Sequence, residues 1–259
     1  MPIITFMTDF GIMDNYVAIV KGALLTQNTD LNIIDISHNV NKHDIVQASY
    51  ILKHAYPYFP KGTIHIVSVK ERYSKDIQFV VVKHNEHFFI GPDNGIFSML
   101  FDELPSEIYI LDKGSDEVFP LPYVASKAVN YLLSEKSIEK IGIKQESVEI
   151  RFAIQPVLGK NHMRGTVILI DDFGNAIVNI KKELFESASD NRSFAIYVKQ
   201  KSPITKLSEH YLSVNIGEVL ALFNSAGYLE IGVSMGNAST LLDIRPEDTI
   251  QIDFYDKTK

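Results

Sequence analysis

The sequence predicts two domains: a layered α/β domain with a mostly parallel sheet over residues 1–155, and a small all-β domain, a sandwich or a barrel, over residues 156–259. In the first part strands alternate with helices, which is typical of a layered α/β domain. After about residue 150 the helical pattern stops, and short strands follow one another between Gly, Asn and Ser turns. The first strand, residues 3–7, is an apolar run that feeds directly into a helix, as parallel sheets begin.

The end of this first strand carries the first candidate ligand-binding residue. Thr8-Asp9-Phe10-Gly11 ends the apolar run, and a helical pattern follows over residues 17–24. In α/β sheets ligands bind beyond the carboxyl ends of the strands, and a carboxylate there can accept two hydrogen bonds from a ribose diol. The alternative is that Asp9 or Asp14 caps the helix. This stretch alone favours neither interpretation.

The other elements of the first part follow from local patterns. Residues 31–36 form a second strand, and Asp44 is the expected N-cap of a helix that ends near Pro57. The later elements are a strand at 62–69, a hairpin of strands at 79–82 and 88–90, a turn at 92–95, a short helix at 96–101, a strand at 108–111 and a helix at 124–133. Lys70-Glu71-Arg72-Tyr73-Ser74-Lys75 is the exit of the third strand.

The second part contains short strands without an internal repeat. A segment with Pro156 and Gly159 shows no helical pattern. The strands are expected at residues 167–170, 177–180, 194–198, 219–223, 228–233 and 250–254.

The composition limits the classes of function. The 259 residues are 46% apolar, which is enough for a substantial core, and the formal net charge of -7 argues against a nucleic-acid partner. The absence of cysteine excludes disulfides, thiolate metal sites and cysteine nucleophiles. No apolar run is long enough to span a bilayer, and the N-terminus has no basic region or cleavage pattern. The sequence therefore predicts a cytoplasmic protein with no membrane partner.

Two further polar clusters are candidate ligand sites. In Asp171-Asp172-Phe173-Gly174-Asn175, Asn175 could pair with the edge of an adenine and Asp171 could hold an ammonium group. The stretch Asn224-Ser225-Ala226-Gly227-Tyr228-Leu229-Glu230 offers a hydroxyl and backbone N–H groups for a carboxylate. Without other information an ordinary turn is the favoured interpretation of the first cluster, and a hairpin loop is the alternative for the second. Pro92-Asp93-Asn94-Gly95 is interpreted as a turn.

Six motifs, taken together, resemble one family. They are MTDFGIMDNYVAIVKGALL, IIDISHNV with HDIVQASYIL, YFPKGTIHIVSV, FIGPDNGIFS, IDDFGNAIVNI, and NSAGYLEI with GNAS. Each motif is weak by itself, but they occur in family order over nearly the whole chain and across both predicted domains. The chain resembles the S-adenosylmethionine (SAM) hydroxide adenosyltransferases, or SAM hydrolases, whose relatives are the chlorinase and fluorinase enzymes.

This resemblance implies an α/β N-terminal domain, a C-terminal β-barrel, and a homotrimer with sites between one subunit's first domain and its neighbour's second. It also implies roles for six substrate-binding residues. Asp9 would chelate the ribose hydroxyls, Asp171 would hold the methionine ammonium, Asn175 would pair with adenine beside Phe173, Tyr211 would lie near the adenine, and Ser225 would take the methionine carboxylate. No cofactor is expected, because SAM is the substrate or ligand.

The sequence departs from this family at the residues that activate water. Hydrolytic members use an Asp, an Arg and a His, and the Asp opens an Asp-Pro-Gly-Val-Gly turn. In our alignment these three positions hold Lys70, Ile77 and Pro120, so the family triad is missing and the catalytic residues are unknown. Lys70 is not the residue of the halogenating relatives either. The favoured interpretation is that its flexible side chain turns out to solvent.

Nearby polar residues offer no obvious replacement for the triad. His38 and His43 are interpreted as satisfied structural residues, because a lone histidine is more often that than a catalyst. Glu71 or Arg72 could point into the pocket, but solvated loop charges are the more common case and the favoured interpretation. No cluster of His, Asp and Glu has metal-ligand spacing, so no metal is expected.

Three hypotheses for function follow. The preferred one is an enzyme that displaces methionine from the 5′-carbon of SAM, giving adenosine with hydroxide or a 5′-substituted adenosine with a halide. The competing one is a non-catalytic binder of SAM or adenosine that has lost hydrolytic activity. A purely structural oligomer, which binds neither ligand, is the third.

Overall fold

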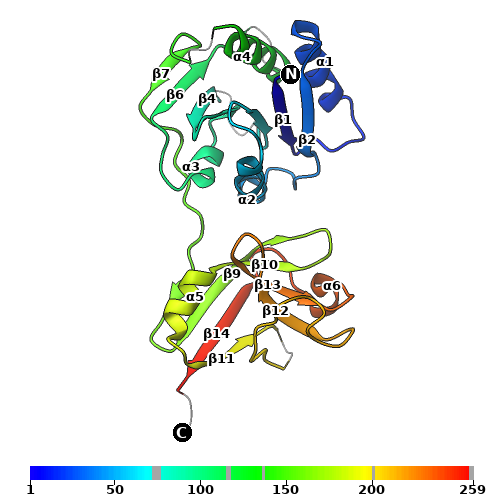
Figure 1. Ribbon diagram of the computed structural model, residues 1–259, viewed down its shortest axis with the longest axis vertical. Helices are drawn as coiled ribbons and strands as arrows, with labels where there is room; N and C mark the ends of the chain where they lie inside the picture. Colours follow the sequence, from blue (N-terminus) through cyan, green and yellow to red (C-terminus); the bar gives the residue numbers. More distant parts are fainter. Residues whose placement is uncertain (72–76, 115–117, 136–137, 200–201, 257–259) are drawn as a thin grey trace. The chain divides into compact units, whose positions relative to one another are not determined.

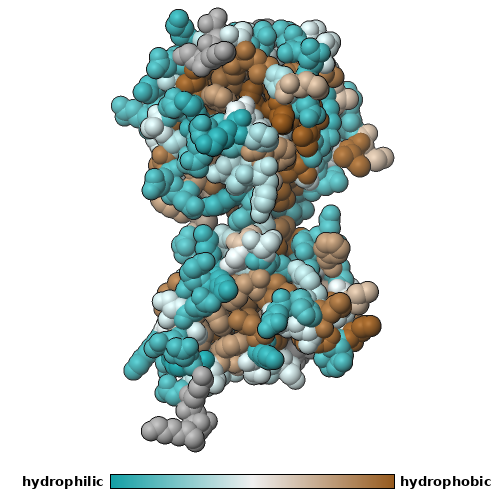
Figure 2. All heavy atoms as spheres, viewed as in Figure 1, coloured by the Kyte–Doolittle hydropathy of each residue, from teal (hydrophilic) through white to brown (hydrophobic). Residues whose placement is uncertain are grey.

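The computed structural model describes residues 1–71, 77–114, 118–135, 138–199 and 202–256. The chain forms two compact units, Met1–Ala153 and Ile154–Lys259, each with its own sheet (Figure 1). Hydrophilic and hydrophobic residues are mixed on the visible face of each unit (Figure 2). Within the described ranges, no helix has the length and apolar character needed to cross a membrane.

A seven-stranded sheet runs through the first unit in the order β2-β1-β3-β5-β4-β6-β7. Its strands are β1 (Ile3–Thr8), β2 (Asn32–Ser37), β3 (Ile64–Ser68), β4 (Phe79–His84), β5 (His87–Pro92), β6 (Glu107–Leu111) and β7 (Ile143–Gln145). The pairs β2–β1, β1–β3 and β3–β5 are parallel, whereas β5–β4, β4–β6 and β6–β7 are antiparallel. The sheet is therefore mixed, and the expected parallel pairing is present in one half of it.

The turn between β4 and β5 explains why these two strands are antiparallel. Asn85 and Glu86 alone separate these two strands, and both have positive φ, 49° and 62°. Two consecutive residues with positive φ form the tight hairpin turn whose twist matches that of paired strands. A parallel connection would need a crossover of about a dozen residues or more.

Helices pack against both faces of this sheet. They are α1 (Tyr16–Gln27), α2 (Ile45–Ala55), the 3-10 helix η1 (Tyr56–Tyr58), α3 (Ile96–Leu100) and α4 (Leu121–Glu135). Ile4 and Phe6 of β1 belong to a core cluster with side chains of α1 and α4, whereas Met7 belongs to a second cluster with side chains of α2 and α3. The predicted cap of α2 is confirmed, since the Asp44 carboxylate accepts a hydrogen bond from the N–H of Gln47 at 2.9 Å.

The second unit contains a curled antiparallel sheet in the order β11-β14-β9-β10-β13-β12, with β8 paired to β9. Its strands are β8 (Val157–Leu158), β9 (His162–Ile170), β10 (Ala176–Lys181), β11 (Ser193–Tyr197), β12 (Val219–Phe223), β13 (Tyr228–Val233) and β14 (Thr249–Tyr255). The first half of β9 pairs with β14 and its second half with β10. Gly165 lies where the pairing changes, and a Cβ there would come within 2.6 Å of Val178 and 2.7 Å of Ile180.

Two features of this unit differ from the sequence prediction. The described residues show no pairing between β11 and β12, the two ends of the sheet, so the sheet is a half-barrel rather than a closed barrel. The helices α5 (Lys182–Ser189) and α6 (Ala238–Leu242) make the unit β-rich rather than all-β. In α5, Leu184, Phe185 and Ala188 lie on one face and pack against the core, with Phe185 buried.

A hydrogen-bonded histidine pair lies in the core of the first unit. His65 is fully buried; its Nδ1 is 2.7 Å from Thr5 Oγ1 and its Nε2 is 3.1 Å from His87 Nδ1. Burial, together with the neighbouring His87, lowers the pKa of His65 to about 3, and burial also lowers the pKa of His87. Both rings are therefore neutral in the native protein near neutral pH.

This pair predicts a loss of stability in acid. As the pH falls below the ordinary histidine value of 6.5, the unfolded chain takes up protons that the native protein excludes. The free energy of unfolding should therefore fall by up to about 1.4 kcal/mol per pH unit for each histidine. His65→Gln keeps hydrogen-bonding groups but does not titrate. Denaturant unfolding across this pH range should therefore show that its free energy of unfolding depends less steeply on pH than that of the wild type. An unchanged slope in the variant would contradict the assignment.

Candidate functional site

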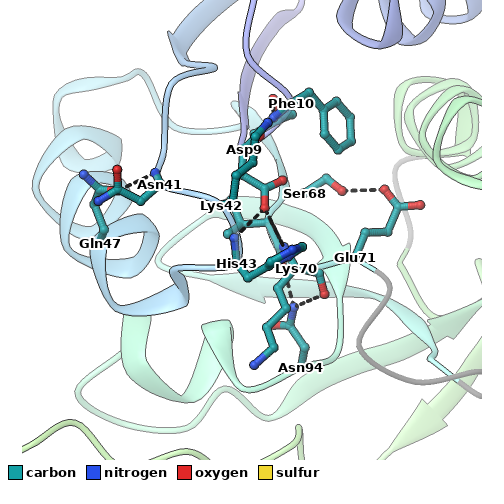
Figure 3. A network of polar contacts seen from close by, with 12 residues as sticks. Asp9, Phe10, Asn41, Lys42, His43, Gln47, Ser68, Lys70, Glu71 and Asn94 are labelled. Atoms are coloured by element: carbon teal, nitrogen blue, oxygen red, sulfur yellow. Dashed lines mark hydrogen bonds and ion pairs between the residues drawn. The ribbon is translucent and has the colours of Figure 1, made fainter.

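Asp9 lies directly beyond the carboxyl end of β1, and its side chain is held by backbone groups from two distant loops. The residue is 6% exposed, and its Oδ2 accepts hydrogen bonds from the N–H of His43 at 2.9 Å and of Lys70 at 3.2 Å (Figure 3). The Asp9 carbonyl accepts a hydrogen bond from the Lys42 ammonium. The described residues provide no hydrogen-bond partner for Oδ1. The protein therefore holds the carboxylate through one oxygen, Oδ2.

The sequence also allowed Asp9 or Asp14 to cap helix α1, and the structure shows neither in that role. The N-cap of this helix is Asn15, and its side chain makes no capping hydrogen bond. Neither Asp9 nor Asp14 occupies the N-cap position, so the capping interpretation is wrong.

Both backbone donors to Asp9 have a left-handed conformation. His43 has φ of 66° and Lys70 has φ of 55°. Asn94 supports the second turn, because its Nδ2 donates to the carbonyl of Val69 at 2.8 Å and to that of Lys70 at 3.2 Å. Asn94 lies in the segment that the sequence interprets as a simple turn, yet its side chain is almost fully buried and holds the Lys70 loop in place.

The side chains of Lys70 and Glu71 take different directions. Figure 3 shows the Lys70 side chain pointing away from the Asp9 carboxylate. Glu71 is 7% exposed, and its Oε2 accepts a hydrogen bond from Ser68 Oγ at 2.7 Å. The interpretation of Glu71 as a solvated loop charge is therefore wrong. Arg72 lies outside the described residues.

Ile77 and Pro120, which our alignment places at the other two triad positions, have side chains that cannot move a proton. Ile77 is buried, and its carbonyl accepts a hydrogen bond from the Lys113 ammonium at 2.9 Å. Pro120 is buried directly before α4. The neighbouring Phe119 ring packs on that of Phe10, the residue after Asp9, with 5.8 Å between ring centroids. The segment before α4 therefore lies beside the Asp9 turn.

The two histidines of this region differ in environment. His38 is buried; its Nδ1 lies 2.9 Å from Thr8 Oγ1 and its Nε2 lies 3.1 Å from Asp35 Oδ1. The His43 side chain is 73% exposed, and its Nδ1 lies 3.8 Å from Asp9 Oδ2. The contribution of His43 to the Asp9 turn thus comes from its backbone N–H. Within the described part of the chain, no group of three His, Cys, Asp or Glu side chains is placed to hold a metal ion.

In the second unit, Asp171 organises the turn between β9 and β10. Its Oδ1 accepts hydrogen bonds from the N–H of Phe173 at 3.0 Å and of Asn175 at 2.8 Å, and its Oδ2 accepts from Asn175 Nδ2 at 3.1 Å. Asn175 is 6% exposed, whereas the Phe173 ring at the tip is 80% exposed. Gly174 has φ of 82°, and a Cβ there would meet the Asn237 side chain at 2.2 Å.

A buried glutamate connects the other predicted residues of this unit. Glu230 of β13 is 2% exposed; its Oε1 accepts from Tyr211 Oη at 2.7 Å and its Oε2 from Asn224 Nδ2 at 3.1 Å. The Asn224 Oδ1 accepts in turn from the N–H of Ala226 at 3.0 Å, across the exposed Ser225. Sequence reasoning did not single out Glu230, although a charged residue inside an apolar strand is a usable signal.

Burial raises the pKa of Glu230, and the nearby Asp171 charge adds to the increase, while hydrogen bonds from Tyr211 and Asn224 oppose it. The Asp171 turn and the Glu230 cluster are therefore close enough to interact. Asn175 also faces this strand, since its Oδ1 lies 3.0 Å from the position of a Cβ on Gly232. Asp171, Asn175, Tyr211 and the Ser225 loop thus gather around Glu230.

Comparison with known protein families gives matches in both units. Residues 4–142 match the SAM hydroxide adenosyltransferase N-terminal domain. Residues 165–251 match the SAM hydroxide adenosyltransferase C-terminal domain.

Relatives with named activities align over nearly the full chain. An (R)-S-adenosyl-L-methionine hydrolase of Methanocaldococcus jannaschii is 29% identical over 97% of this chain and 96% of its own length. A fluorinase of Actinopolyspora mzabensis is 24% identical over 89% of this chain and 90% of its own.

Solved structures share the fold. An uncharacterised conserved protein from Thermotoga maritima superposes with a TM-score of 0.83 and 27% identity, covering 96% of this chain and 99% of that one. A conserved hypothetical protein from Thermus thermophilus superposes with a TM-score of 0.76 and 24% identity, covering 98% and 100% of the two chains.

The buried Glu230 predicts a pH dependence opposite to that of His65. Because its pKa is raised, the native protein binds more protons than the unfolded chain at pH values just above the ordinary glutamate value of 4.5. This carboxyl group therefore lowers the free energy of unfolding as the pH rises through that window. In Glu230→Gln this contribution should disappear, so the stability of the variant relative to wild type should increase with pH. Thermal unfolding of both proteins at several pH values measures the difference, and a constant difference would contradict it.

Proposed function

Because this chain belongs to the SAM hydroxide adenosyltransferase family, we propose that it binds SAM and displaces methionine from the ribose 5′-carbon with hydroxide or a halide. The observation that carries the proposal is the match of both units to the two domains of that family. Relatives along nearly the whole chain are named as SAM hydrolase and fluorinase, which both fit displacement at this carbon.

The two polar clusters support complementary roles for the ligand. In the first unit, Asp9 Oδ1 would accept hydrogen bonds from the ribose hydroxyls. In the second unit, Asp171 would hold the methionine ammonium and Asn175 would pair with the adenine edge beside Phe173. Tyr211 would lie near the adenine.

Ser225 fits the methionine carboxylate in this proposal. It is exposed and lies in the short loop that Asn224 holds through the N–H groups of Ala226 and Tyr228, at 3.0 and 3.1 Å. Its hydroxyl is a donor of the kind that carboxylates accept. The Asp171 ammonium site and this hydroxyl together would recognise the amino-acid end of SAM.

The reaction makes limited demands on acid catalysis. A nucleophile attacks C5′, the C5′–S bond breaks, and its electron pair goes to the sulfonium sulfur, which leaves as neutral methionine. No acid is needed for departure, so rate enhancement comes from positioning a desolvated nucleophile behind the carbon. When water is the nucleophile, its proton needs an acceptor.

Glu71 is the proposed proton acceptor for water. The side chains at the aligned triad positions are Lys70, which points away from Asp9, and the non-ionisable Ile77 and Pro120. The Glu71 carboxylate lies one residue beyond Lys70, buried and oriented by Ser68. General-base catalysis of this kind contributes on the order of 10²–10⁴ in rate.

The residues Lys70, Ile77 and Pro120 also favour a second candidate function, because Lys70 points away from Asp9 and neither of the other two side chains can transfer a proton. A non-catalytic binder of SAM or adenosine would keep both polar clusters and would need no proton acceptor. Ile77 and Pro120 are compatible with this function as well.

Product analysis separates these functions. Purified protein incubated with SAM should release methionine together with adenosine, or with 5′-chloro-5′-deoxyadenosine that increases with chloride concentration. Glu71→Gln should lower adenosine formation about 10²-fold or more, while the exposed Glu139→Gln serves as a matched control. Binding without any displacement product would reject the enzyme and support the binder. Absence of both would leave the structural oligomer.

Asp9→Asn tests the ligand site independently of turnover. An amide accepts more weakly from two hydroxyls than a carboxylate does, so binding of SAM and adenosine should weaken by about 1–3 kcal/mol. Titration calorimetry measures the loss, with Asp14→Asn as control because Asp14 is exposed in the following loop. Equal affinity of Asp9→Asn and wild type would exclude Asp9 as a ribose ligand.

A further inference from the structure

We propose that His38 is a positioning residue for the ligand-binding carboxylate of Asp9, acting through Thr8 and oriented by Asp35. The inference rests on the proposed role of Asp9 as a ribose ligand and deepens it. His38 makes no hydrogen bond to the Asp9 carboxylate. It forms hydrogen bonds with Thr8, which precedes Asp9, and with Gly11, which follows it by two residues.

A line of side chains leads from the surface of the first unit to this turn. Lys21 of α1 contacts Asp35 Oδ2 at 2.6 Å, and Asp35 Oδ1 lies 3.1 Å from His38 Nε2. The other ring nitrogen, Nδ1, lies 2.9 Å from Thr8 Oγ1. His38 is 6% exposed and Thr8 is fully buried, so solvent cannot readily replace the contact between these two residues.

The chemistry of the groups determines which atom donates and which accepts in each contact along this line. Asp35 Oδ1 lies 3.1 Å from His38 Nε2, and an ionised carboxylate only accepts, so the tautomer with the proton on Nε2 is the one that suits this contact. In the neutral ring Nδ1 then accepts the proton of the Thr8 hydroxyl, whose oxygen is left to accept the N–H of Phe10 at 3.2 Å. Burial opposes ionisation of Asp35, but hydrogen bonds from Lys21 and His38 outweigh it and lower the pKa of that carboxyl.

The backbone of His38 holds the far side of the same turn. Its carbonyl accepts the N–H of Gly11 at 2.7 Å. The His38 ring also packs edge-on against Phe6 of β1, with 4.9 Å between centroids, which fixes its position beneath the turn. His38 therefore contacts Thr8 and Gly11 directly, and it reaches the Phe10 N–H through the Thr8 hydroxyl.

These contacts go beyond what β1 needs to form. The strand is already paired with β2 up to Met7 and with β3 up to Thr8, whose Cα partner is Ser68. The hydrogen bonds through His38 act on Phe10 and Gly11, after the strand has ended. Their effect is to set the path of the chain that carries the Asp9 carboxylate toward the N–H groups of His43 and Lys70.

A matched pair of substitutions tests the inference. Thr8→Val removes the hydroxyl with little change of shape, whereas Thr8→Ser retains it. Adenosine affinity measured by calorimetry should fall roughly tenfold in Thr8→Val and should remain within about twofold of wild type in Thr8→Ser. Asp35→Ala, at a half-exposed position that tolerates substitution, should weaken adenosine binding in the same direction. Equal binding by Thr8→Val, or by Asp35→Ala if Thr8→Val does not fold, would overturn the inference.

A double-mutant cycle separates positioning from general stabilisation. If Thr8 acts through Asp9, adding Thr8→Val to Asp9→Asn should cause no further loss of adenosine affinity. Losses that add fully in the double variant would overturn the inference. Wild-type binding is the first measurement: its absence would reject the proposed ribose site, whereas wild-type binding with additive losses would reject only the role of His38.

Discussion

The candidate site of the first unit depends on the hydrogen bonds that hold one oxygen of Asp9. The donors are the backbone N–H groups of two residues in the left-handed conformation, His43 and Lys70. A left-handed conformation costs a non-glycine residue roughly 1–2 kcal/mol. A hydrogen bond to a charged group contributes about 1.5–3 kcal/mol, so the contacts from His43 and Lys70 can offset their own strain. Because the carboxylate is already oriented, a ligand that meets Oδ1 does not have to order it on binding.

The second unit uses a buried carboxylate in a different way. Glu230 is held by side-chain donors, the Tyr211 hydroxyl and the Asn224 amide, rather than by backbone groups. These donors belong to separate loops, so one buried residue places both of them. The raised pKa of Glu230 reflects its burial and the Asp171 charge.

The proposed reaction fits a site built mainly for positioning. A sulfonium substrate is a cation with a neutral leaving group, and acidic side chains in both clusters favour such a ligand. The buried Glu71 is the remaining chemical group that could accept a proton in the described part of the Lys70 loop.

By itself the sequence determined an α/β part followed by a β-rich part, the cap at Asp44 and the family, since these features are encoded in local periodicity and contiguous motifs. Only the tertiary structure decided the mixed pairing of the first sheet and the open edge of the second. It also decided the partners of Asp9, which lie 34 and 61 residues away. The burial of Glu71 and the contacts of Glu230 were likewise beyond the sequence. The physical reason is that these features depend on positive φ at single non-glycine residues and on packing between distant loops, which no local pattern encodes.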